Sequence, residues 1–114
     1  MSEAFVWFHN SNEKPGDSVE FYQSLLGWKR ADGRTGPPGM MLFAGEKGPF
    51  AAVASDEGVV GWIPYAQVAD VDVATKKAKK LGATVLKEKT RGPAGEFSIV
   101  RDPGGAAIAL WQKA

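Results

Sequence analysis

The residue best suited to acid–base chemistry in this chain is His9, the only histidine of the sequence. An imidazole can act near neutral pH as a general base, bind a metal ion or hydrogen-bond a ligand. The sequence offers no orienting partner for His9, and a strand histidine satisfied by a neighbouring backbone group is the alternative interpretation. Cysteine is absent from the sequence, which excludes disulfides, thiolate metal sites and a cysteine nucleophile.

The acidic and basic residues have simpler explanations than catalysis. Asp17, Asp70 and Asp72 stand at the starts of predicted helices, where a carboxylate stabilises the free N–H groups and the helix dipole. The lysines of residues 76–80 lie opposite the apolar positions of one helix, which indicates a solvated surface. The formal charge of +1 and the lack of an aromatic platform beside these lysines argue against nucleic-acid binding.

An internal repeat with a spacing of 55 residues indicates which elements position these side chains. Four segments recur at this spacing: Trp7 as Trp62, Asp17 as Asp72, residues 26–27 as 81–82, and residues 51–54 as 106–109. Two copies of a small α+β unit are expected to build a shared sheet with a cleft between the halves, and the cleft is the expected place for function.

Alternation and helical periodicity predict the same order in both halves, namely a strand, a helix and three strands. In the first half we expect strands at residues 4–9, 28–31, 40–44 and 50–55, and a helix at 17–26 that Gly27 ends. In the second half we expect strands at 62–69, 84–88, 96–101 and 106–111, and a helix from Asp70 or Asp72 to Leu81. The predicted loops are residues 10–16, 33–39, 56–61, 90–95 and 102–105.

Three groups of motifs in this order carry a family resemblance. They are Glu20-Phe21-Tyr22 followed by Leu26-Gly27-Trp28, residues 68–72 leading to Lys80-Leu81-Gly82, and Asp102-Pro103-Gly104-Gly105 before a last strand that contains residues 109–112. With the repeat, they resemble the vicinal oxygen chelate superfamily of glyoxalases, extradiol dioxygenases and bleomycin-resistance proteins, in particular its short bacterial members. The resemblance implies an α+β fold of two tandem βαβββ modules that form a curved mixed sheet with a central cleft.

The resemblance covers almost the whole chain and implies one domain of residues 1–114. Module 1 is expected at about residues 4–56 and module 2 at about residues 61–114. Family members of this size commonly form homodimers, so the resemblance also implies a homodimer. The sequence has no segment typical of a signal peptide or a membrane span, which predicts a cytoplasmic protein that does not bind membranes.

Enzymes of the family hold one divalent metal ion in the cleft, with ligands from the first and last strands of each module. The resemblance places the corresponding positions at Trp7, Ala54, Trp62 and Ala109, with Ile63 in place of Trp62 if the register slips by one residue. None of these side chains donates to a metal. We therefore expect no metal and no cofactor, and no metal-dependent glyoxalase or dioxygenase activity.

The same positions predict what the cleft offers instead. Strand alternation places Trp7 and His9 on one face, and it is expected to bring Trp62 and Trp111 to the same inner wall, beside Ala54 and Ala109. Indole rings beside small side chains favour a flat or apolar ligand, with His9 as the main polar group. The alternative is that tryptophan and alanine simply fill a well-packed core.

Three functions remain open from the sequence. The first is a metal-independent protein that binds a small apolar or aromatic molecule, as bleomycin-resistance relatives do. The second is an enzyme of lyase, isomerase or dioxygenase type that uses His9 or an unrecognised metal site. The third is a structural or partner-binding module with a filled core.

Overall fold

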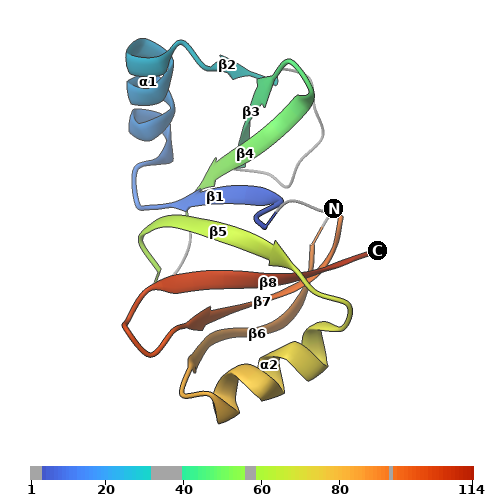
Figure 1. The fold of residues 1–114 in the computed structure, drawn as a ribbon. Helices are drawn as coiled ribbons and strands as arrows, with labels where there is room; N and C mark the ends of the chain where they lie inside the picture. The colour runs from blue at the N-terminus through green and yellow to red at the C-terminus, as the bar shows by residue number, and fades with distance from the viewer. Residues whose placement is uncertain (1–3, 32–39, 56–58, 93) are drawn as a thin grey trace. The chain divides into compact units, whose positions relative to one another are not determined.

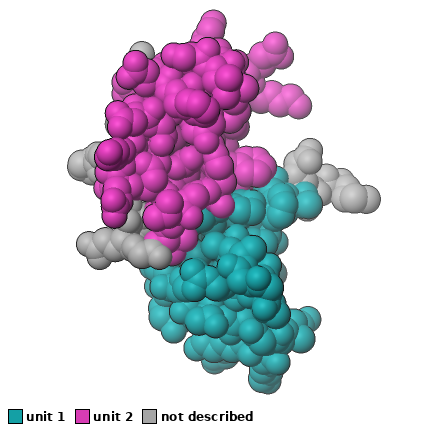
Figure 2. Space-filling model, turned by 90° about the vertical axis from the view of Figure 1, so that its left-hand side faces the viewer, with its two compact units in different colours: residues 1–6, 63–114 teal, residues 7–62 magenta. Residues whose placement is uncertain are grey.

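The computed structural model describes residues 4–31, 40–55, 59–92 and 94–114. They form two compact units, one of residues 7–62 and the other of residues 63–114 together with the segment up to Val6 (Figure 2). We call them module 1 and module 2. The predicted loop at residues 33–39 and part of the predicted linker at 56–61 lie outside the described residues.

The described residues of module 1 form one helix and four strands (Figure 1). Along the chain these are β1 (Trp7–Ser11), α1 (Pro15–Leu26), β2 (Lys29–Arg30), β3 (Met41–Gly45) and β4 (Gly48–Ala54). In the sheet the order is β2-β3-β4-β1. β1 runs parallel to β4, and the other neighbours are antiparallel.

Module 2 repeats this plan. Its elements are β5 (Gly61–Gln67), which begins at the boundary between the units, α2 (Val71–Lys80), β6 (Thr84–Gly92), β7 (Gly95–Arg101) and β8 (Ala107–Lys113). The sheet order is β6-β7-β8-β5, with β5 parallel to β8 and the rest antiparallel. The predicted α+β class and the twofold βαβββ order are confirmed.

The helix ends follow local chemistry. The Asp70 carboxylate accepts a hydrogen bond from the Val73 N–H at 3.0 Å and so caps α2, as predicted. Gly27 has a φ of 70°, a left-handed conformation that ends α1 at little cost for glycine. Helix α1 begins at Pro15, before the predicted start, because proline is compatible with the first turn of a helix. Among the described residues no helix is long and apolar enough to span a bilayer.

The predicted loop at residues 90–95 is shorter in the structure. β6 continues to Gly92 and β7 begins at Gly95, so the two strands form a long hairpin. Gly95 is required there because a Cβ atom at this position would collide with the backbone oxygen of Gln112 on β8.

Candidate functional site

The two faces of the module 2 sheet differ in what covers them. The hydroxyl groups of Thr75 on α2 and Ser98 on β7 lie 2.8 Å apart, so α2 covers the face that carries Ser98. Since side chains alternate along a strand, the neighbours of Ser98 on β7 point the other way. We call this other side the helix-free face of module 2. Among the residues that strand register places on it are Tyr65, Lys87, Phe97, Ile99, Ala109 and Trp111.

Aromatic side chains gather on the helix-free face of module 2. The rings of Tyr65 and Phe97 have centroids 5.7 Å apart and are tilted by 42°. Phe97 is the register partner of Trp111, and Tyr65 is the partner of Ala109. Three aromatic residues from three different strands therefore lie around one alanine, whose side chain is small.

The residues of this face differ in the exposed fraction of their side chains. Ala109 is fully buried and Tyr65 is 9% exposed, whereas Phe97 and Trp111 are half-buried. The Lys87 ammonium lies 5.5 Å from the Phe97 ring centroid, within the range of a cation–π interaction. The face thus combines a buried floor and partly exposed ring surfaces, which suit a flat apolar molecule, with a positive charge at one side.

Module 1 also has a helix-free face. Val53 on β4 packs in one core cluster with Val19 of α1, so the alternate residues of β4 face away from the helix. Ala54 is one of them, and its register partner on β1 is Ser11. By alternation from Ser11, His9 and Trp7 lie on the same face. The predicted neighbours Trp7, His9 and Ala54 thus share one face of module 1.

His9 itself is only 8% exposed and pairs in register with Ala52. His9 also takes part in a further interaction within the protein. A buried imidazole on a strand is held in one place, which both the functional and the structural interpretation of His9 require.

Trp62 lies elsewhere than expected. Its indole N–H donates to the Tyr22 hydroxyl at 2.8 Å, and its ring lies 6.2 Å from that of Trp28. It therefore belongs to the aromatic cluster that packs beside α1. Alternation along β5 puts it opposite Tyr65, and hence not on the face that carries Ala109 and Trp111.

The reason is a register shift of one residue between the modules. Ser11 pairs with Ala54, and Tyr65 pairs with Ala109. Ala109 follows Ala54 by 55 residues, but Tyr65 follows Ser11 by 54. A shift of one inverts every side chain of a strand. Ile63, the alternative position given for the first strand, therefore faces the same way as Tyr65, and the expectation that Trp62 does so is wrong.

The residues that the resemblance assigns to the metal-ligand positions do not fit a divalent ion. Trp7, Ala54, Ala109 and Ile63 carry no lone-pair donor suited to a metal. Within the described ranges no three His, Cys, Asp or Glu side chains converge. The side chains present favour packing and apolar contact over coordination.

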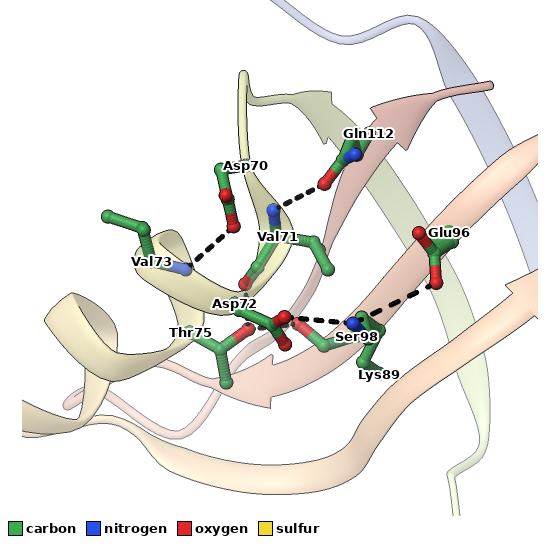
Figure 3. A network of polar contacts seen from close by, with 9 residues as sticks. All are labelled: Asp70, Val71, Asp72, Val73, Thr75, Lys89, Glu96, Ser98 and Gln112. Carbon is green, nitrogen blue, oxygen red and sulfur yellow. Dashed lines mark hydrogen bonds and ion pairs between the residues drawn. The ribbon is translucent and has the colours of Figure 1, made fainter.

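The helix side of module 2 carries a network of polar contacts beside the buried Val71 and Val100 (Figure 3). The Val71 N–H donates to the Gln112 side chain at 2.9 Å, and the Thr75 hydroxyl donates to the Val71 carbonyl at 2.6 Å. At the edge, Lys89 donates to Asp72 at 2.8 Å and lies 3.9 Å from Glu96. The hydrogen bond with Asp72, followed by its charge and that of Glu96, raises the pKa of Lys89. These contacts attach α2 to one face of the sheet.

Sequence reasoning missed Tyr65, Phe97 and Lys87 as residues of one face. The position of Tyr65 could have been predicted, because the one-residue slip considered for Ile63 also places Tyr65 on the face of Ala109. The position of Lys87 could not have been predicted, because the pairing of β6 with β7 shifts between Val85 and Lys87 and again between Lys87 and Thr90. Such bulges break the simple alternation on which sequence patterns depend.

Comparison with known proteins agrees with this fold. The family model described as "Glyoxalase-like domain" matches residues 8–111. A protein named "Putative glyoxylase CFP32" from Mycobacterium bovis is 36% identical over 93% of this chain and 44% of its own length. The "Anthracycline biosynthesis protein DauV" of Streptomyces sp. strain C5 is 26% identical over 95% of this chain and 46% of its own. The chain thus spans less than half the length of these relatives.

Solved structures share the fold. A glyoxalase/bleomycin resistance protein/dioxygenase superfamily member from Vibrio splendidus 12B01 superimposes with a TM-score of 0.65. The alignment covers 94% of this chain and 97% of that one, at 12% sequence identity, and so speaks for the fold alone. Together with the match over residues 8–111, the twofold βαβββ order identifies this chain as a member of the glyoxalase-like domain family.

Proposed function

We propose that this protein binds a small, flat, apolar or aromatic molecule without a metal ion, and that the helix-free face of module 2 makes the main contact. The observation that carries the proposal is the grouping of Tyr65, Phe97 and Trp111 around Ala109. Trp7, His9 and Ala54, which share the helix-free face of module 1, are also proposed as ligand-binding residues, considered on that face by itself. Trp62 is no longer included, because its indole is engaged with Tyr22.

The physical reason is the state of the aromatic rings. A ring that only fills a core contributes most to the free energy of unfolding when it is completely buried. Phe97 and Trp111 instead keep part of their surface exposed, and both lie on strands. Half-buried rings around a small residue can stack on a flat guest with little loss of side-chain entropy. A relative is named for anthracycline biosynthesis, and anthracyclines are planar aromatic compounds, which is in keeping with such a guest.

Independence from metal is supported by the chemistry of the side chains. We assign Trp7, Ala54, Ile63 and Ala109 to the positions where metal-dependent relatives would need nitrogen or oxygen donors, and none of these side chains supplies one. Binding is therefore expected to proceed equally well in protein treated with a chelator and in protein supplied with zinc or manganese.

A fluorescent probe tests the proposal. N-phenyl-1-naphthylamine, an uncharged aromatic compound whose emission rises in apolar surroundings, is titrated into chelator-treated protein. We expect saturable binding, and Phe97→Leu should weaken it by roughly tenfold because the ring-stacking surface is lost. The matched control is Phe50→Leu, at a half-buried phenylalanine that packs on Trp28 in module 1, and it should change the affinity less than about twofold.

Two results would contradict the proposal. One is the absence of saturable binding to the folded protein. The other is binding that Phe97→Leu does not weaken, or that appears only when a metal ion is added.

Enzymatic turnover is a second candidate, favoured by the buried position of His9 and by the 36% identity to a protein named as a glyoxylase. A fixed imidazole could move a proton to or from a bound carbonyl compound. This candidate requires an activity whose pH–rate profile changes in His9→Gln, whereas pure binding requires none. A homodimer and a cytoplasmic location remain predictions, and light scattering would test the first.

A further inference from the structure

The charged residues on the helix-free face of module 2 have one sign. Lys87 pairs in register with Ile99 and lies beside the Phe97 ring, and Arg101 follows two residues after Ile99 on the same face. Lys113 has the same orientation as Trp111 at the end of β8. Lys87 is half-buried, and its ammonium group lies 5.5 Å from the Phe97 ring centroid, at the border of the aromatic surface.

The carboxylates of the same strands are directed to other partners. Glu88 lies 3.8 Å from Lys79 of α2, and Glu96 lies 3.9 Å from Lys89 on the helix side (Figure 3). In the turn between β7 and β8, Asp102 accepts hydrogen bonds from the backbone N–H groups of Gly104 and Ala106. Among the described strand residues of module 2, the register thus puts cations but no carboxylate on the helix-free face.

We infer that the molecule bound by this face is an aromatic anion, such as an aromatic carboxylate, sulfonate or phenolate, with its rings on Phe97 and Trp111 and its negative group toward Lys87. This inference rests on the proposed function and adds the charge of the ligand to it. A cation beside a partly desolvated surface attracts an anion more strongly than it would in bulk water. The same charge repels a cationic aromatic molecule, so the face discriminates by sign.

Two probes with the same ring skeleton isolate the charge. 8-Anilinonaphthalene-1-sulfonate is an anion, and N-phenyl-1-naphthylamine is its uncharged parent. We expect Lys87→Met, which keeps the alkyl stem, to weaken the sulfonate about fivefold more than the parent compound. The matched control is Lys89→Met on the same strand but on the helix side, and it should leave the ratio of the two affinities unchanged. High salt should weaken only the sulfonate.

The outcomes separate the two proposals. If Phe97→Leu weakens the parent compound but Lys87→Met leaves the ratio of affinities unchanged, the face binds aromatic molecules without preference for anions, and only this inference fails. If Lys87→Met and Lys89→Met change the ratio equally, the attraction comes from overall charge and the inference again fails. If neither probe binds, or Phe97→Leu has no effect, the proposed function fails first.

Discussion

The two modules repeat one order of elements but, Trp7 apart, gather their clustered aromatic rings on opposite sides. In module 1 the rings gather beside the helix, where Tyr22 stacks on Trp28 at 5.4 Å and Trp28 meets Phe43 at 5.3 Å. In module 2 the rings of Tyr65 and Phe97 lie on the face away from the helix. The helix of module 2 buries Val71 and makes hydrogen bonds to the sheet in place of aromatic contacts (Figure 3).

This difference shows how a duplicated unit can divide its tasks. An aromatic side chain that packs beside a helix is not available to contact a ligand. Trp62, whose indole N–H is hydrogen-bonded to Tyr22, is an example. Small polar side chains such as Thr75 and Ser98 can hold a helix through a few buried hydrogen bonds. The rings of Tyr65 and Phe97 in module 2 can therefore lie on the helix-free face. We interpret module 1 as the more structural half.

The largest expected effect is on the packing of module 1. Phe43 is 1% exposed within the aromatic cluster, so Phe43→Ala should lower the free energy of unfolding by about 3–5 kcal/mol. Phe97→Ala in module 2 should cost about 1–2 kcal/mol, because its ring is only half-buried. Urea denaturation measures both. Equal losses would show that the rings of both modules serve packing alone.

The next effect concerns the polar attachment of α2. Thr75→Val preserves the shape of the side chain but leaves the fully buried Ser98 hydroxyl without its 2.8 Å partner. We expect a loss of about 1–3 kcal/mol, and a smaller loss in the double variant Thr75→Val/Ser98→Ala, which leaves no orphaned hydroxyl. If the single variant unfolds at the same urea concentration as the wild type, hydrogen bonds do not hold this helix.

A smaller effect distinguishes the helix starts. Asp70 caps α2 through its side chain, whereas Lys14 at the start of α1 makes no such hydrogen bond. Asp70→Ala should therefore cost about 1 kcal/mol, and Asp70→Asn should cost little because asparagine caps equally well. Equal losses for both variants would mean that the charge of Asp70, rather than its cap, stabilises the helix.

The smallest effect involves the exposed Lys89. Its pKa is raised in the folded state, so the ion pair with Asp72 stabilises the protein while the lysine is charged and loses that effect as the pH rises past the ordinary value of 10.5. We expect Lys89→Met to be slightly less stable than the wild type at neutral pH. The difference should vanish at high pH and in strong salt, because the pair is exposed. A difference that persists at high pH would point to packing of the alkyl stem.

Much of the fold was accessible from the sequence because its signals are local. The helix stop at Gly27, the cap at Asp70 and the order of strands follow from residue types and short spacings. Which face of the sheet a strand residue occupies is harder to predict, since a slip of one residue in the register turns every side chain of the strand to the other face. The repeat of 55 residues holds between Ala54 and Ala109 but becomes 54 between Ser11 and Tyr65. For this reason the 55-residue repeat predicted the wrong face of the strand for Trp62.

The candidate site was therefore only partly predictable. Ala109 and Trp111 share a face as expected, because both lie on one regular strand. The partners Phe97 and Lys87 depend on a hairpin with two register shifts, which are set by tertiary packing and leave no simple pattern in the sequence. A binding face assembled from several strands needs the register of each, whereas a helix cap needs only four neighbouring residues.

The four tryptophan indole groups allow the most direct test of the difference between the modules. Their N–H resonances, assigned with single Trp→Phe variants, are followed by NMR during titration with 8-anilinonaphthalene-1-sulfonate. We expect the Trp111 signal to move with saturation, while the signals of Trp28 and Trp62 in the packed cluster of module 1 stay in place. Movement of Trp28 and Trp62 with a stationary Trp111 would contradict the assignment of the binding face to module 2.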